Sequence, residues 1–287
     1  MPRNTMTAVT ALMTATLAAV APASATFVPP RVSPQASVSQ TIGTTQLTIS
    51  YSRPSVKNRT IWGALVPYDE VWRTGANEAT TFTTSDDVTI NGAPLPAGTY
   101  SLATIPGKSE WTVIFNKDRE LWGTYQYKPE NDALRITVKP IEVPFTESLE
   151  FSFATIGEDS ATVMMRWEKL AITFTVKVDV VGTTLAKARA AVAAAAADDW
   201  RTPYVAANWL LSTSLPPQEA LGWLDRSIKI QATPQNLGAK ARGLAATGDT
   251  AQAIALAKRA IELAKAANPN ANTANLENLI VQWQGAK

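Results

Sequence analysis

The stretch Leu47-Thr48-Ile49-Ser50-Tyr51-Ser52 shows most directly which kind of fold this chain adopts. Its apolar side chains alternate with small polar ones, which is the two-residue period of a strand with one buried face. The alternation returns in segments separated by turn residues, among them the hairpin signal Asn91-Gly92. These segments lie at 80–84, 88–90, 100–102, 111–115, 134–138, 149–153, 163–167 and 172–178. The pattern predicts about nine short antiparallel strands in a β-sandwich or barrel over residues 38–181.

Residues 182–287 have a different composition and a different period. Alanine replaces valine and threonine, and the apolar spacing changes to three or four, which predicts helices. Residues 220–230 match residues 253–263 at an offset of about 33 positions, and this spacing of paired helices resembles the tetratricopeptide repeat. The large aromatic positions of that repeat's first helix are missing. We therefore predict an all-α, tetratricopeptide-like region, with an ordinary helical bundle as the alternative.

The first 25 residues have the pattern of a signal peptide. Arg3 is their one charged residue, residues 8–21 are apolar or small, and Ala23-Ser24-Ala25 is a small-x-small cleavage site. A membrane anchor is the alternative, but the run is shorter than the roughly 20 residues that a spanning helix needs. We expect an exported protein, in the bacterial periplasm or outside the cell, with a proline-rich linker over 26–37 and no later membrane span.

The composition excludes several kinds of chemistry. The chain has no cysteine and no histidine, so it has no disulfide, no thiolate or imidazole metal ligand and no Ser-His-Asp mechanism. We therefore expect no metal site and no cofactor. A net charge of +2, with 17% charged residues and no concentrated basic patch, gives no reason to expect a nucleic-acid partner.

Aromatic and charged side chains gather between Tyr51 and Thr80. The arginines offer planar forks for a carboxylate or phosphate, the tryptophans offer faces for stacking, and the amide and carboxylate can accept hydroxyl hydrogens. Such a set suits a small polar ligand, such as a sugar or an acidic metabolite. The candidate ligand-binding residues are Arg53, Trp62, Trp72, Arg73, Asn77 and Glu78.

The same residues also have a structural interpretation. Arg73 and Glu78 are five positions apart across Gly75, and a tight turn there would let them form an internal ion pair. Trp62 and Trp72 would then close the open end of the sandwich. The sequence leaves both interpretations open.

Several of these motifs together resemble a known family. They are Tyr51-Ser52-Arg53-Pro54, the segments 62–68, 71–80 and 95–100, and Trp111, Asn116 and Trp122-Gly123. Over roughly residues 38–180 the chain is similar to the exported bacterial family called domain of unknown function 2911. The resemblance implies a bacterial, exported, β-rich protein, and it implies no activity and no site residues. The helical region lies outside it.

The function we expect is binding rather than catalysis. The β domain would hold a small polar ligand or glycan, and the helical region would dock a protein partner on a concave face. One alternative is a structural envelope protein without a ligand. The other is a carboxylate-dependent hydrolase of envelope material, with Glu78 as acid or base.

Overall fold

The structure is a computed structural model that describes residues 29–285. All of its helices and strands belong to the compact unit Ser33–Lys287. The expected signal peptide at 1–25 lies outside the described residues, so it stays a prediction. Within residues 29–285, no helix is both long and apolar enough to cross a membrane.

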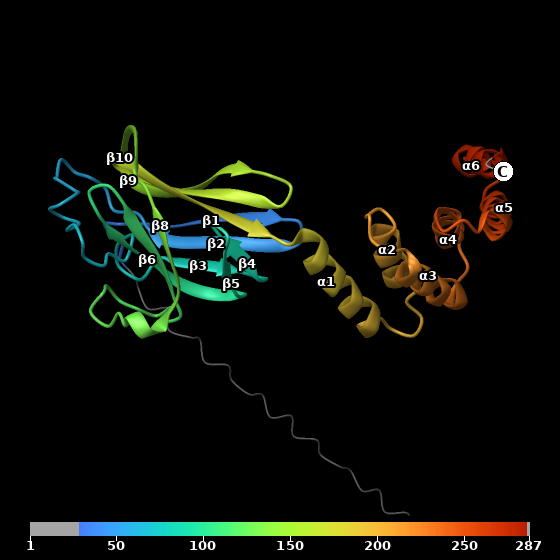
Figure 1. Ribbon diagram of the computed structural model, residues 1–287, viewed down its shortest axis with the longest axis horizontal. Helices are drawn as coiled ribbons and strands as arrows, with labels where there is room; N and C mark the ends of the chain where they lie inside the picture. The colour runs from blue at the N-terminus through green and yellow to red at the C-terminus, as the bar shows by residue number, and fades with distance from the viewer. Residues whose placement is uncertain (1–28, 286–287) are drawn as a thin grey trace, which may run out of the picture. The chain divides into compact units, whose positions relative to one another are not determined.

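In the described part of the chain, ten strands form two antiparallel sheets, and neither sheet closes on itself (Figure 1). The six-stranded sheet has the order β1-β2-β3-β6-β7-β8 and the four-stranded sheet the order β5-β4-β10-β9. The β-rich class predicted from the alternating segments is therefore confirmed. The strands are β1 (Gln35–Ile42), β2 (Thr45–Ser52), β3 (Thr81–Thr84), β4 (Val88–Ile90), β5 (Ala93–Leu95), β6 (Gly98–Pro106), β7 (Trp111–Asn116), β8 (Asp132–Val138), β9 (Ile141–Ile156) and β10 (Ser160–Val178).

The hairpin between β4 and β5 is the one that the sequence indicates. Ile90 pairs with Ala93, so the loop has two residues. Asn91 and Gly92 both have positive φ, at 48° and 87°. A type I′ turn requires that conformation at both loop positions, and its twist matches that of the flanking strands.

The prediction of about nine short strands differs from the structure at both ends of the β region. β1 begins at Gln35, inside the expected linker, because its outward residues are as polar as linker residues. The alternation predicts two strands at 163–167 and 172–178, but both segments belong to the single strand β10. Register shifts on either side of Glu168, which has a φ of 56°, leave Ala171 and Ile172 both buried. A bulge changes which side chains face the core without ending the strand.

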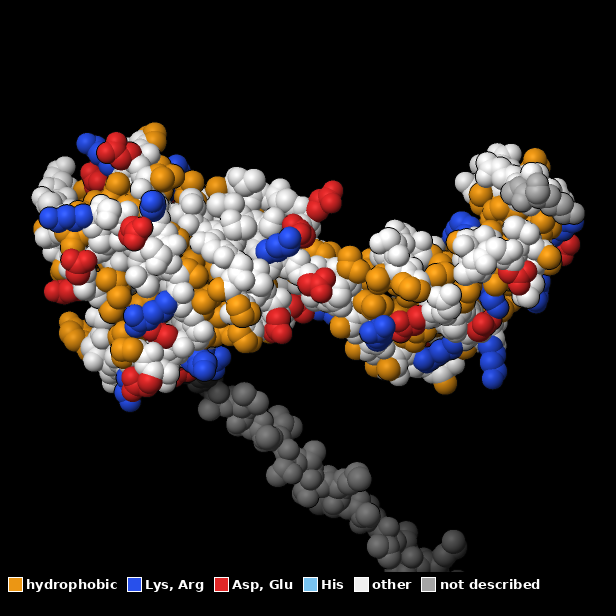
Figure 2. Space-filling model, viewed as in Figure 1, with side chains coloured by type: hydrophobic (Ala, Val, Ile, Leu, Met, Phe, Trp, Pro, Cys, Tyr) orange, Lys and Arg blue, Asp and Glu red, His pale blue; other side chains and the backbone are white. Residues whose placement is uncertain are grey.

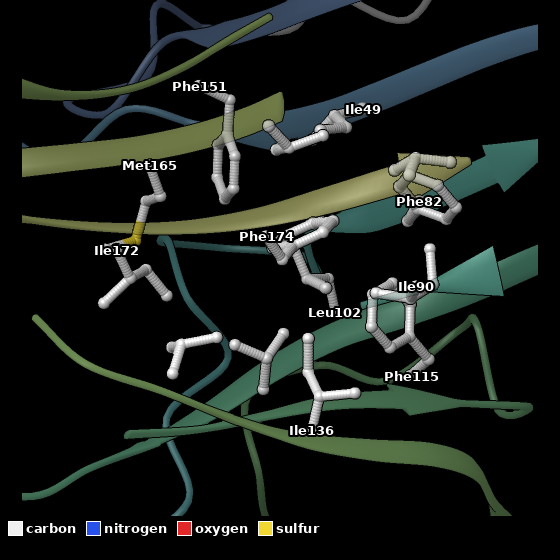
Figure 3. Close-up of a cluster of buried hydrophobic side chains, with 14 of the residues drawn as sticks. Ile49, Phe82, Ile90, Leu102, Phe115, Ile136, Phe151, Met165, Ile172 and Phe174 are labelled. Carbon is white, nitrogen blue, oxygen red and sulfur yellow. The ribbon is translucent and has the colours of Figure 1, made fainter. Parts of the chain in front are cut away.

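The inner faces of the two sheets enclose one apolar core (Figure 3). Ile49 and Phe82 from the six-stranded sheet point toward Phe151 and Phe174 from the four-stranded sheet. Phe82 packs edge-to-face against Phe115, with ring centroids 5.3 Å apart. Large side chains therefore fill the space between the sheets, which lie about 10 Å apart in such packings.

Up to residue 285, where the described residues end, six helices follow the strands and confirm the predicted change of fold class. Thr233 begins one of them with a capping box, in which its hydroxyl and the Asn236 side chain satisfy each other's backbone N–H. The helices are α1 (Val180–Ala194), α2 (Arg201–Leu210), α3 (Gln218–Ile230), α4 (Pro234–Ala246), α5 (Thr250–Ala267) and α6 (Ala274–Gly285). Helices α2 and α3 pack together, as do α4 and α5. This pairing is compatible with a helical repeat, and the tetratricopeptide resemblance stays a prediction.

The β region runs into α1 without a linker. Asp179 follows β10 directly and caps α1, and its carboxylate accepts a hydrogen bond from Gly182 N. Val180 packs against the β core at Gly43, where an added Cβ would lie 2.6 Å from the valine side chain. Lys187 donates to the Asp86 carboxylate and to the Thr44 carbonyl. The first turns of α1 therefore contact the sheet, although the sequence placed the boundary between 181 and 182.

Candidate functional site

The candidate residues lie on the long connection between β2 and β3, which isolated bridges attach to the β domain. Ser55 bridges to Ser148, Trp72 to Thr104 and Glu78 to Trp122. Gly75 permits the closest approach, since an added Cβ would lie 3.2 Å from the Ser52 carbonyl and 2.8 Å from the Thr80 hydroxyl. The connection is therefore fixed against the sheets along its length.

Trp62 and Trp72 belong to a cluster of four tryptophans. Trp62 contacts Trp111 with ring centroids 4.8 Å apart, and Trp72 stacks on Trp167 at 5.8 Å with 19° between the ring planes. Trp111 and Trp167 are each 1% exposed. Within the described residues, the buried indole nitrogens of Trp62 and Trp111 have no hydrogen-bond partner. The two candidate tryptophans thus extend the core, which favours the structural interpretation for them.

Arg53 connects the loop to the four-stranded sheet. Its Nε donates to the Leu149 carbonyl at 2.8 Å, and its Nη2 lies 3.6 Å from the carboxylate of Glu150. Glu150 also accepts from Arg166 across the pair β9–β10. The fork of Arg53 therefore serves contacts within the β domain.

Arg73 lines a small polar pocket of about 220 Å³. Its Nη1 donates to the Asn77 carbonyl at 2.9 Å. Among residues 29–285 no carboxylate comes within 4.0 Å of the half-buried Arg73 guanidinium, so it forms no ion pair there. The rest of the lining comes from Pro67, Glu70, Val71, Trp72, Gly123, Thr124 and Tyr125.

Asn77 and Glu78 do not line the Arg73 pocket. Asn77 has a φ of 58°, and its side-chain amide donates to the Ser33 carbonyl at 3.1 Å. Glu78 lines a different pocket, of about 390 Å³, beside β1 and β2. The structure therefore places Arg73 and Glu78 at separate pockets rather than around one concavity.

Tyr125 is a pocket residue that the sequence does not identify. It is 93% exposed, and its ring would lie 3.1 Å from a Cβ added to Gly123. The same added Cβ would lie 3.4 Å from Arg73 Nη1, so the glycine brings the ring and the guanidinium close together. The available signal was an aromatic residue two positions after Trp122-Gly123, but the sequence does not place this loop beside residue 73.

A polar network fixes the loop that carries Tyr125. Asp132 accepts hydrogen bonds from Asn116, Tyr127 and Arg135 at 2.6 to 2.8 Å. Burial, together with the Asp132 carboxylate, raises the pKa of Tyr127 to about 12, so the phenol stays protonated as a donor. The loop is thereby anchored at both ends, to β7 and to β8.

Charges around the site are mixed. Figure 2 shows acidic and basic side chains interspersed on the visible face of the β region, without a broad field of one sign. Among the described residues no group of three or more acidic side chains could hold a metal ion. Recognition in the Arg73 pocket would therefore depend on local contacts rather than on long-range attraction.

Comparison with known proteins finds a family that matches the β region. A family model described as Protein of unknown function (DUF2911) matches residues 33–176, which is about half of the chain and includes every candidate residue. No curated protein and no solved structure matches the chain. The match confirms the resemblance found from the motifs, and the helical region lies outside it.

Proposed function

The chain belongs to the DUF2911 family, and on that premise we propose that it is a non-enzymatic binding protein for a small polar ligand bearing a carboxylate. The ligand would occupy the pocket between Arg73 and Tyr125. The observation that carries the proposal is the half-buried guanidinium of Arg73, which pairs with no carboxylate of residues 29–285 and faces a hollow.

The Arg73 guanidinium has N–H donors that are available for a ligand. An arginine presents five N–H donors in a planar fork, and the hydrogen bond to the Asn77 carbonyl uses one of them. A carboxylate accepts two parallel hydrogen bonds from such a fork, which fixes its orientation as well as its charge.

The other pocket residues indicate the shape, polarity and size of the ligand. The exposed ring of Tyr125 offers an apolar face for a flat or cyclic ligand body. Glu70 at the rim can accept a hydrogen bond from a ligand hydroxyl. The pocket, at about 220 Å³, is smaller than the roughly 300–1,000 Å³ of sites for drug-sized molecules. A single sugar acid or a hydroxy acid matches these three features.

Binding is favoured over catalysis by the residues themselves. The chain lacks histidine and cysteine, which supply most general bases and thiol nucleophiles. Glu78, the carboxylate that a hydrolase would use, lines a different pocket from Arg73. The tryptophan cluster favours the second candidate, a structural protein without a ligand.

The wider setting of the proposal comes from the sequence. The signal-peptide pattern supports export to the periplasm or beyond. The paired helices α2–α3 and α4–α5 support the docking of a protein partner by the helical region.

Thermal unfolding in the presence of small carboxylates tests the proposal. We expect glucuronate, galacturonate or a hydroxy acid to raise the melting temperature, because a ligand at 100 times its Kd adds about 2.7 kcal/mol to stability. Arg73→Ala should abolish this shift and leave the melting temperature of the free protein nearly unchanged. Arg119→Ala removes the same charge at an exposed position outside the pocket, so it should keep the shift. Strong destabilisation by Arg73→Ala, with no shift from any carboxylate, would favour the structural candidate.

A further inference from the structure

The outer face of the six-stranded sheet is an unusual surface. Leu47, Ile49 and Tyr51 of β2 point into the core, so the residues between them point outward. The outward residues of β1, β2 and β3 carry hydroxyl or amide groups, and none of them is charged. This uncharged surface is called the hydroxyl face below.

The register of the strands aligns these hydroxyls in rows. Ser39 lies opposite Thr48, Thr48 opposite Thr83, and Thr83 opposite Thr99 on β6. A second row, two residues along each strand, contains Ser37, Ser50 and Thr81. Neighbouring strands lie about 4.8 Å apart and alternate residues about 7 Å apart, so the hydroxyls form a two-dimensional array.

The hydroxyls of the array are held by one another. Ser39 Oγ and Thr48 Oγ1 lie 2.8 Å apart, and Thr83 Oγ1 and Thr99 Oγ1 lie 3.0 Å apart. A hydroxyl has one donor and two acceptor positions, so each member of such a pair keeps capacity for a further partner. The paired hydroxyls are thus oriented before any ligand arrives, which lowers the entropy lost on binding.

A hollow lies at one end of the array. The pocket of about 390 Å³ is lined by Gln35, Ser37, Ser50, Ser52, Thr81 and Glu78 among others. Among the described residues, its polar lining is almost wholly hydroxyl and amide, with one carboxylate, and it includes no cationic side chain. Such a lining suits a neutral, hydroxyl-bearing ligand and does not suit an anion.

The four-stranded sheet has a different outer face. There Arg166 pairs with Glu150 at 2.7 Å, and Lys177 pairs with Asp159 at 3.1 Å. Charges on exposed strands keep sheets soluble and keep edge strands from pairing with other chains. The hydroxyl face has no such charges on β1, although β1 is the edge strand of its sheet.

We propose that the hydroxyl face binds an uncharged polysaccharide chain, with one sugar unit in the hollow and the following units along the rows. A neutral glycan is itself a regular array of hydroxyl donors and acceptors, so it matches the array in both chemistry and lack of charge. Its hydroxyls can make the hydrogen bonds that water would otherwise make to the rows, so little enthalpy is lost on binding. The proposal rests on the serine and threonine hydroxyls and does not depend on the state of Glu78. It is also independent of the Arg73 pocket.

The test measures binding of neutral hexasaccharides to the exported chain by titration calorimetry. The probes are maltohexaose, cellohexaose, laminarihexaose and chitohexaose, with an alginate hexasaccharide as the charged comparison. We expect at least one neutral probe to bind, to bind more tightly than its monosaccharide, and to keep its affinity between 50 mM and 500 mM NaCl.

Substitutions then locate the site. The double variant Thr48→Val, Thr83→Val removes two row hydroxyls while keeping β-branched shape, and it should weaken binding at least tenfold. Thr162→Val makes the same change on the outward side of β10 and should leave affinity unchanged. Arg73→Ala should also leave it unchanged, which separates this proposal from the carboxylate site. If the double variant unfolds, Ser39→Lys at the exposed edge of the same row replaces it, with the same expected loss.

Three outcomes would overturn the proposal. In the first, no neutral hexasaccharide binds at millimolar concentration. In the second, binding occurs but the row variants do not change it. In the third, sedimentation shows that the wild type self-associates and that the row variants are monomeric without any loss of glycan affinity. The face would then be a contact between copies of the chain.

Discussion

The β region and the helical region are both packed, but with side chains of different size. The core between the sheets contains Phe82, Phe115, Phe174, Trp111 and Trp167. The helical cores instead contain fully buried alanines, at 207, 220, 239, 241 and 257. Sheets that lie about 10 Å apart need large side chains between them, whereas the distance between packed helices, about 8–10 Å, is shortest where the contact residues are small. We therefore expect a smaller side chain to destabilise the β core and a larger side chain to destabilise the helical core.

The largest expected effect follows removal of an aromatic ring from the β core. Phe82 is fully buried and contacts the rings of Phe115 and Phe174, at centroid distances of 5.3 and 6.4 Å. Phe82→Ala should lower the free energy of unfolding by about 3–5 kcal/mol, because burial is lost and a cavity remains. Urea unfolding measures this. Tyr125→Ala removes an aromatic ring from an exposed position and should change stability by less than about 0.5 kcal/mol. An equal loss in both variants would contradict the comparison.

A smaller effect is expected when a large side chain enters the helical core. Ala257 on α5 is fully buried and shares a cluster with Ala241 and Ile280. Ala257→Leu should destabilise the helical region by about 1–3 kcal/mol through overpacking. Ala266→Leu makes the same change at an exposed position of the same helix and should be nearly neutral. Far-UV circular dichroism during thermal unfolding checks both. A stabilised Ala257→Leu protein would mean that the helices are loosely packed.

The smallest effect concerns the connection between the two regions. Burial acts to raise the pKa of Asp86, but the hydrogen bonds from Lys187 and Ser85, together with the positive charge of Lys187, outweigh it and hold the pKa below its ordinary value of 3.8. A carboxyl group with a lowered folded-state pKa stabilises the protein at pH values above its unfolded pKa. That contribution is lost as the pH falls below about 4 and through the folded-state value.

Comparing the wild type with Lys187→Met by thermal unfolding between pH 7 and pH 3 tests this contact. Above pH 4 the variant should be less stable by under about 1 kcal/mol, the usual size for a partly exposed pair. The difference should shrink as the pH falls below 4. A difference that persists unchanged at pH 3 would mean that Lys187 acts through packing rather than through Asp86.

Much of the fold can be read from the sequence, since local patterns encode it. The alternation in Leu47–Ser52 predicts β2, Asn91-Gly92 predicts the hairpin, and Thr233-Pro234 predicts the start of α4. The errors are β1, whose outward residues look like a linker, and β10, where a bulge hides the continuity of the strand. In both places the hydrophobic period fails locally while backbone hydrogen bonds to a neighbouring strand continue.

The sequence by itself determined the order of the elements, the change from strands to helices and the family. It also identified the loop that contains Arg73. Only the tertiary structure decided how the candidate residues divide: Trp62 and Trp72 pack with Trp111 and Trp167, whereas Arg73 meets Tyr125 and Glu78 meets the hydroxyl face. Partners separated by tens of residues in the chain make these contacts. No local pattern encodes such pairings, because they arise only when the register of distant strands and the path of the connecting loops are fixed together.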